Sequence, residues 1–127
     1  FDADVVIIML GTNDIRSFSC EEAKTDFMAN LKSIAEEYAA LPTVKKVYIA
    51  SSIFISNADV IRQMSDGELA SLQEKVANEL GCPYIDIYHG LYDYFITGEG
   101  FASDNLHPNN AGYRKMAEYI ADNLELN

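Results

Sequence analysis

Apolar residues recur along the chain in strand-like and helix-like patterns that alternate. A continuous apolar run over residues 4–10, reading DVVIIML, predicts a parallel strand that is covered on both faces and is therefore central in its sheet. Two shorter apolar runs predict further strands over 44–52 and 84–88.

The segment after the first strand has the period of an amphipathic helix. Ser19 and Glu22 form an S-x-x-E pattern typical of a helix start, and Pro42 marks the end. The predicted apolar face of this helix consists of Phe27, Leu31, Ile34 and Tyr38.

Two more helices are predicted further along the chain. Ser65 and Glu68 form a second capping pattern, and the apolar spacing that follows ends at Gly81, a residue suited to a helix C-terminus. The last helix is expected to start near Asn109 and to continue to Leu124. Its apolar positions, like those of the second helix, recur every three or four residues.

The order of these elements predicts the fold class. Strand, helix, strand, helix, strand, helix implies right-handed crossovers and a flavodoxin-like three-layer α/β/α arrangement around a parallel sheet. Residues 53–64 show no clear pattern, and 89–103 contain three glycines and several aromatics, which favours an irregular loop with a short helix. Only three strands are predicted, whereas such sheets usually have about five. We therefore expect an incomplete sheet that lacks strands on one side.

Length and composition exclude several classes of protein. The 127 residues suffice for one domain at most, and 49% hydrophobic with 23% charged residues is typical of a globular protein. No apolar run approaches the roughly 20 residues needed to span a bilayer. A net charge of −11 disfavours nucleic acid as a partner. Cys20 and Cys82 are expected to be free thiols, and no pattern of metal ligands is visible.

The start of the chain is also informative. It opens at Phe1, without an initiator methionine or a signal peptide, and enters an apolar strand almost at once. We interpret it as beginning in the middle of a protein, and the compartment stays undetermined.

A polar tetrapeptide follows the first strand at the carboxyl edge, where open α/β sheets bind their ligands. Gly11 permits a sharp turn there, and the side-chain amide of Asn13 can donate to a developing oxyanion. Alternatively, Asn13 or Asp14 hydrogen-bonds its own backbone in a simple turn.

A second polar cluster, DNLHPN over 104–109, precedes the last helix. An acid three positions before a histidine can bind one ring nitrogen and leave the other free as a base, which suits Asp104 and His107. The alternative is a histidine with only a structural or surface role.

Together, GTND after an apolar strand and D-x-x-H-P-N-x-x-G-Y before the last helix resemble the third and fifth signature blocks of the SGNH/GDSL hydrolases. The resemblance implies a serine ester hydrolase that needs no cofactor. Asn13 would be an oxyanion donor, His107 the general base and Asp104 its orienting acid, while Gly11 permits the turn. The pattern is most similar to carbohydrate O-acetylesterases, which implies a small ester substrate, such as an acetylated carbohydrate.

The resemblance also shows what this sequence lacks. The family's nucleophilic serine and the glycine of its second block have no match, so residues 1–127 are interpreted as one partial hydrolase domain. Ser51 and Ser52 lie at the correct sheet edge, but a serine at a strand end is usually a turn former. Of the other serines, Ser17, Ser19 and Ser65 fit helix starts, and Ser103 is badly placed because it directly precedes Asp104. We expect the chain alone to lack serine-esterase activity.

Other interpretations stay open from the sequence. The chain could be a degenerate, noncatalytic domain that binds a glycan or a protein, or a fragment that forms an oligomer or recruits an upstream chain through the strand Val5–Leu10. His89 and Asp86 are interpreted as a surface histidine and a hydrogen-bonded strand-end acid. A run of aromatics favours either a sugar platform or the packing of a loop: Tyr88, Tyr92, Tyr94, Phe95 and Phe101.

Overall fold

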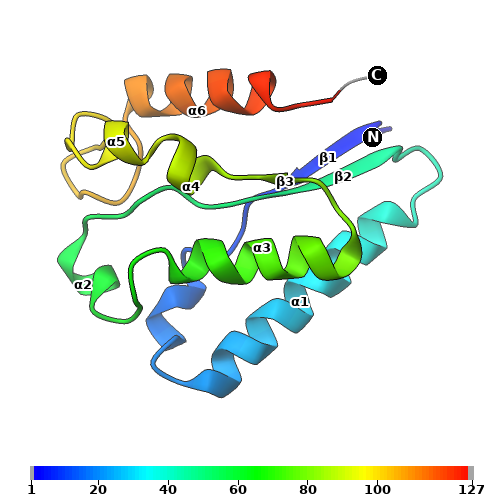
Figure 1. Ribbon diagram of the computed structural model, residues 1–127, viewed down its shortest axis with the longest axis horizontal. Helices are drawn as coiled ribbons and strands as arrows, with labels where there is room; N and C mark the ends of the chain where they lie inside the picture. The colour runs from blue at the N-terminus through cyan, green and yellow to red at the C-terminus, as the bar shows by residue number, and fades with distance from the viewer. Residues whose placement is uncertain (1, 126–127) are drawn as a thin grey trace.

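The fold is a three-stranded parallel sheet between two layers of helices (Figure 1), as the computed structural model describes it for residues 2–125. The strands β1 (Val5–Ile8), β2 (Lys46–Ala50) and β3 (Tyr84–Ile85) lie side by side in that order. The helices α1 (Glu21–Ala39) and α3 (Glu68–Leu80) cover one face, and α6 (Asn110–Asp122) covers the other. The predicted α/β fold class is confirmed.

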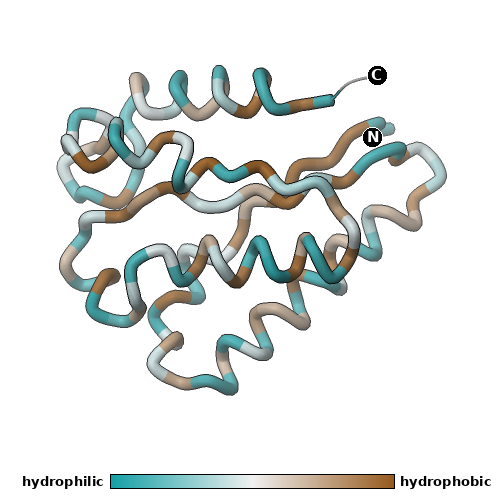
Figure 2. The backbone as a smooth tube through the Cα atoms, viewed as in Figure 1, coloured by the Kyte–Doolittle hydropathy of each residue, from teal (hydrophilic) through white to brown (hydrophobic). Residues whose placement is uncertain are grey.

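Alternate residues of β2 point to opposite faces of the sheet and build two cores. Val47 and Ile49 pack with α1 and α3, whereas Tyr48 and Ala50 pack in the cluster that includes residues of α6. All four are buried, so the central strand is apolar on both sides. The hydropathy colouring shows the same apolar strands between helices with mixed surfaces (Figure 2).

Helix α1 begins differently from the prediction. Cys20, not Ser19, precedes the first helical residue, and no side chain caps the helix, so the predicted capping box with Glu22 is wrong. Phe27 and Leu31 are buried as expected, whereas Tyr38 is exposed, and Ala35 is the last buried residue of the helix. The helix ends before Pro42, as predicted.

Helix α3 carries half of the predicted capping box. The Glu68 carboxylate accepts a hydrogen bond of 2.9 Å from the backbone N–H of Ser65, but the Ser65 hydroxyl returns none to the helix. Glu68 also forms an ion pair with Lys24 of α1, which ties the two helices together. Gly81 ends the helix with a left-handed φ of 66°, as expected.

Short helical turns replace parts of the predicted strands and loops: η1 (Asp14–Ser17), α2 (Ala58–Ile61), α4 (Ile87–Gly90) and α5 (Tyr92–Phe95). The strand predicted over 84–88 stops at Ile85, because the Asp86 side chain accepts from the N–H of His89 and starts α4. The strand predicted over 44–52 is likewise shorter at both ends, and α6 stops at Asp122.

The position of β1 agrees with a sheet that lacks strands on one side. The apolar run predicts a strand covered on both faces, but β1 pairs only with β2 within residues 2–125 and therefore lies at an edge. It ends at Ile8, and Ile7, Met9 and Leu10 are exposed. An exposed apolar edge with unpaired backbone groups is a surface on which another strand can pair.

Several absences hold within the same described range. No helix there is long and apolar enough to cross a membrane, and no group of three histidine, cysteine or acidic side chains could hold a metal ion. Cys20 and Cys82 are both free thiols. Phe1, Leu126 and Asn127, which belong to the domain expected over 1–127, lie outside the described residues.

Candidate active site

The loop after β1 turns sharply at Gly11 and leaves the Asn13 side chain free. Gly11 has a φ of 129°, and a Cβ there would lie 2.6 Å from the Leu69 side chain, so only glycine fits. The N–H of Asp14 donates to the Gly11 carbonyl over 2.9 Å and closes the turn. In the described part of the chain, the Asn13 amide makes no hydrogen bond, which leaves both of its N–H groups available to a ligand.

A buried glutamine that the sequence did not single out fixes this loop in place. Gln73 of α3 is fully buried, and its amide N–H₂ donates to the Leu10 carbonyl over 2.7 Å and to the Ser52 hydroxyl over 3.1 Å. Its carbonyl oxygen accepts from the Ser52 N–H over 3.0 Å. One side chain thus joins the segments that follow β1 and β2. The only signal in the sequence is a polar residue on the apolar face of a helix.

Asp104 and His107 form the predicted pair. The Asp104 carboxylate lies 2.5 Å from Nδ1 of His107 and also accepts from the backbone N–H groups of His107 and Leu106, at 2.9 and 3.0 Å. A neutral ring that donates its Nδ1–H to Asp104 has a free lone pair on Nε2, the state required of a base. These three hydrogen bonds, above all the one from the His107 ring, lower the pKa of Asp104 to about 2.

The loop that carries this pair is closed at its base. Phe101 and Pro108 form an antiparallel bridge, and the N–H of Ala102 donates to the His107 carbonyl over 2.8 Å. Asn109 caps α6 through the Gly112 N–H, and its own amide donates to the carbonyls of Glu99 and Phe101. The position of His107 is therefore fixed by the start of α6.

Asn13 and His107, which lie far apart in the sequence, line one cavity of about 210 Å³. Met9, Ser52 and Tyr113 also contribute to its wall. The structure therefore brings together the predicted oxyanion donor and the predicted base, with Asp104 directly behind the base. The His107 side chain is 68% exposed, so the cavity is open to solvent in this chain.

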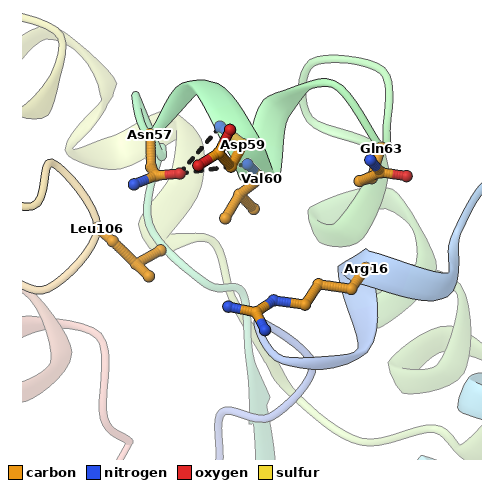
Figure 3. A pocket seen from close by; sticks show the side chains of 6 residues that line it. All are labelled: Arg16, Asn57, Asp59, Val60, Gln63 and Leu106. Carbon is orange, nitrogen blue, oxygen red and sulfur yellow. Dashed lines mark hydrogen bonds between the residues drawn. The ribbon is translucent and has the colours of Figure 1, made fainter.

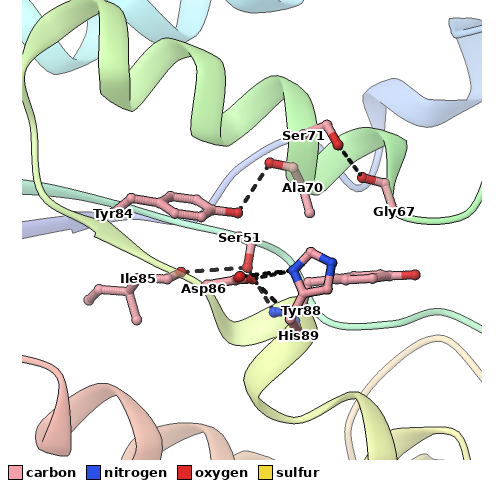
Figure 4. A network of polar contacts seen from close by, with 9 residues as sticks. All are labelled: Ser51, Gly67, Ala70, Ser71, Tyr84, Ile85, Asp86, Tyr88 and His89. Carbon is pink, nitrogen blue, oxygen red and sulfur yellow. Dashed lines mark hydrogen bonds and ion pairs between the residues drawn. The ribbon is translucent and has the colours of Figure 1, made fainter.

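Neither serine at the edge of the sheet is arranged as a nucleophile. Ser52 lines the cavity, but its hydroxyl is held by Gln73 and, at 3.4 Å, by Thr12. Ser51 is fully buried and accepts from the N–H of Tyr88 over 2.8 Å, which gives it a role at the start of α4 (Figure 4). No serine hydroxyl within residues 2–125 hydrogen-bonds the ring of His107.

A second pair with the same spacing lies after β3. Asp86 accepts from the N–H of His89 over 3.1 Å and binds its Nδ1 at 2.8 Å, as Asp104 does with His107 (Figure 4). The ring of His89 packs edge-on against Tyr88 and does not line the cavity of Asn13. The interpretation of His89 as a surface residue is thus confirmed, although its pairing with Asp86 was missed.

The aromatic run after this pair serves mainly in packing. Phe95 and Phe101 are buried in one cluster, with ring centres 5.2 Å apart, and Tyr94 packs against Phe95. Tyr88 is buried and donates from its hydroxyl to Asp66. Of the two interpretations, packing of the loop accounts for these contacts.

Asn13 and the Asp104–His107 pair thus lie at the carboxyl edge of a parallel sheet, where open α/β folds bind their ligands. The family model of the GDSL-like lipases and acylhydrolases matches residues 1–120. The chain belongs to this family, and the predicted membership in the SGNH/GDSL hydrolases is confirmed.

Esterases are among the proteins similar to the chain. It is 27% identical to an acetylxylan esterase of Xylanibacter ruminicola, across 95% of this chain and 28% of that protein. It is 25% identical to a multidomain esterase of Ruminococcus flavefaciens, across 98% of the chain and 16% of the relative. The chain therefore spans less than a third of the curated relatives it matches.

Solved structures agree on the fold. The chain is 20% identical to an acetylxylan esterase from Geobacillus stearothermophilus. The two structures match with a TM-score of 0.74, over 99% of this chain and 61% of the esterase chain. Structures of three catalytic mutants of that enzyme are among the matches. One mutant replaces a serine, one an aspartate, and one a histidine three residues after that aspartate. The chain is also 21% identical to a lipase/acylhydrolase from Enterococcus faecalis. These structures match with a TM-score of 0.67, over 94% of this chain and 60% of the acylhydrolase chain.

Gln73→Ala should destabilise the fold, because it leaves the buried Ser52 N–H and the partly buried Leu10 carbonyl without their partner. We expect a loss of about 2 to 4 kcal/mol in the free energy of unfolding, since each such group costs about 1 to 3 kcal/mol. Asn78→Ala, on the exposed side of the same helix, should change it by less than about 0.5 kcal/mol. Urea unfolding measures both, and equal effects would contradict the role of Gln73.

The low pKa of Asp104 predicts a specific titration. Because the folded-state pKa of about 2 lies below the ordinary value of 3.8, the ionised carboxylate stabilises the fold above about pH 4, and this contribution is lost as the pH falls toward 2. The side-chain carboxyl resonance of Asp104, followed by NMR, should show the low pKa. His107→Ala should raise it, and a midpoint near 3.8 in the unsubstituted protein would contradict the geometry.

Proposed function

We propose that this chain supplies the base, the orienting acid and one oxyanion donor of a serine ester hydrolase. The observation that carries the proposal is the shared cavity of Asn13 and His107, with Asp104 bonded to Nδ1 of the ring. Family membership supports it independently. The noncatalytic alternative gives no reason for a free amide and a correctly oriented imidazole to face the same space.

The proposed reaction has two steps. Nε2 of His107 takes the proton of a serine hydroxyl as the serine oxygen bonds to the ester carbonyl carbon, and the imidazolium then gives that proton to the leaving alcohol. Water attacks the resulting acyl-serine in the same way and releases the acid. Asp104 keeps Nδ1 protonated and stabilises the imidazolium, and the Asn13 N–H₂ donates to the oxyanion of each tetrahedral intermediate.

The nucleophilic serine is proposed to come from a segment outside this sequence. No serine of the described chain bonds His107, whereas β1 has a free edge beside the site. A strand that pairs with β1 would cover Ile7 and Met9, and its carboxyl end would lie next to the cavity, because the strands are parallel. We prefer this occupant of the edge to a second copy of the chain, because the chain matches only about 60% of the solved relatives.

The proposed substrate is a small acyl ester, with an acetylated carbohydrate as the leading candidate. The two curated relatives are named an acetylxylan esterase and a multidomain esterase, which supports this choice. A cavity of about 210 Å³ is small, and it suits a short acyl group better than a long one.

Loss of the base should abolish turnover in the full-length protein. We expect His107→Ala to lower kcat for p-nitrophenyl acetate by roughly 10⁴-fold, and Asp104→Asn by somewhat less, because the serine proton then has no properly oriented acceptor. Asn13→Ala should cost roughly 10²- to 10³-fold in kcat, because it removes one donor among several.

The second aspartate–histidine pair provides the matched control. His89→Ala and Asp86→Asn remove the same local hydrogen bonds outside the cavity, and kcat should stay within about twofold of the unsubstituted protein. Wild-type turnover in a folded His107→Ala protein, or equal losses in the two pairs, would refute the assignment.

The 127-residue chain alone should neither turn over p-nitrophenyl acetate nor react with a fluorophosphonate probe. The covalent route needs a serine within about 2.6 to 3.2 Å of the base. Ser52, the serine of the cavity, is instead bonded to Gln73. Mass spectrometry of the labelled chain and of the full-length protein tests this, and stoichiometric labelling of Ser51 or Ser52 would show that the nucleophile lies within the chain.

A further inference from the structure

A second cavity lies beside the candidate active site, on the other side of Leu106. It has a volume of about 430 Å³ and is lined by residues of η1, α2 and the loop before α6: Arg16, Asn57, Asp59, Val60, Gln63 and Leu106. Leu106 also lines the cavity of His107, so the two spaces share a wall. Figure 3 shows the Arg16 side chain extending from η1 toward Leu106, with its guanidinium below the side chains of α2.

Arg16 is the basic residue that lines this cavity, and it is one of four that form no ion pair within residues 2–125, with Lys75, Arg114 and Lys115. Five of the nine basic residues pair with carboxylates: Lys24, Lys32, Lys45, Lys46 and Arg62. Arg16 forms no ion pair or hydrogen bond within residues 2–125, although its guanidinium faces a cavity that contains Asp59. The carboxylate of Asp59, the acidic residue of the cavity lining, is paired with Arg62.

Of the other two amide side chains that line the cavity, Asn57 already forms hydrogen bonds and Gln63 forms none within the described residues. The Asn57 carbonyl oxygen caps α2, and its amide donates to the Asp104 backbone carbonyl over 2.9 Å. Gln63 makes no side-chain hydrogen bond within the described residues and can offer an amide to a hydroxyl. Val60 and Leu106 add an apolar surface.

We propose that this cavity is a subsite for a sugar unit that bears a carboxylate, such as a uronic acid, with Arg16 as the residue that recognises the carboxylate. A planar guanidinium binds a carboxylate through two parallel hydrogen bonds, which a lysine or an amide cannot reproduce. Gln63 and the apolar wall would contact the hydroxyls and the ring. The volume falls within the roughly 300 to 1,000 Å³ typical of ligand sites.

This inference rests on the proposed function, because the ester would lie at His107 and the acidic sugar unit in the adjacent cavity, on the other side of Leu106. Leu106 lines both cavities, and Asn57 holds its loop against the start of α2 by donating to the Asp104 carbonyl. An ester whose alcohol part is a branched glycan could thus place its acyl group at His107 and an acidic branch at Arg16. The chain would then discriminate among esters by a charge outside the reacting bond.

Titration of the purified protein with D-glucuronate and with D-glucose, its neutral counterpart, tests the subsite. We expect glucuronate to bind at least about tenfold more tightly at low salt, with NMR shifts centred on Arg16, Gln63 and Leu106, because hydrogen bonds between two charged groups are strong. Arg16→Gln should remove the preference, and Arg16→Lys should retain only part of it. Arg114→Gln, which changes an exposed arginine of α6 outside the cavity, is the matched control and should keep it.

Two results would overturn the proposal: equal binding of the two sugars, or a preference for glucuronate that survives Arg16→Gln. An amide spectrum of each variant shows that it is folded, so loss of the preference cannot be assigned to unfolding. The measurement involves no ester bond. It can therefore fail while the tests at His107 succeed, or succeed while they fail.

Discussion

The three hydrogen bonds of the buried Gln73 side chain join the carboxyl ends of the two strands between which the site is built. They hold the Leu10 carbonyl beside Ser52, and Gly11 and Asn13 follow shortly after Leu10. A buried amide is costly unless every donor and acceptor is paired, and here each is. The same contacts that satisfy Gln73 therefore help to position Asn13, the proposed oxyanion donor.

The acid–base pair depends on a different and more local constraint. A D-x-x-H sequence lets the aspartate accept from both the backbone and the ring of the histidine, and this geometry forms twice, at the start of α4 and in the loop before α6. The spacing thus creates an oriented imidazole but does not make it a base for any substrate. What distinguishes His107 is the loop closed by Asn109, which directs it to the cavity of Asn13.

Sequence reasoning succeeded where the signal was periodic or local. The apolar faces of α1 and α3, the end at Gly81 and the pairing of Asp104 with His107 all follow from short-range patterns. It failed at the ends of the strands, where the side chain of Asp86 starts a helical turn in a segment with good strand propensity. It also missed Gln73, because the partners of this residue lie 63 and 21 positions away and no local pattern encodes such contacts.

The fold and the site are open on the same side. Met9, which is exposed at the end of β1, is also a wall of the cavity that holds Asn13 and His107. Covering this edge with a further parallel strand would satisfy the free backbone groups of β1, bury Ile7 and reduce the exposure of His107 to water. Lower exposure to water would in turn strengthen the hydrogen bond between His107 and Asp104, since hydrogen bonds are stronger in a less polar medium. Completion of the sheet would thus also reinforce the proposed base.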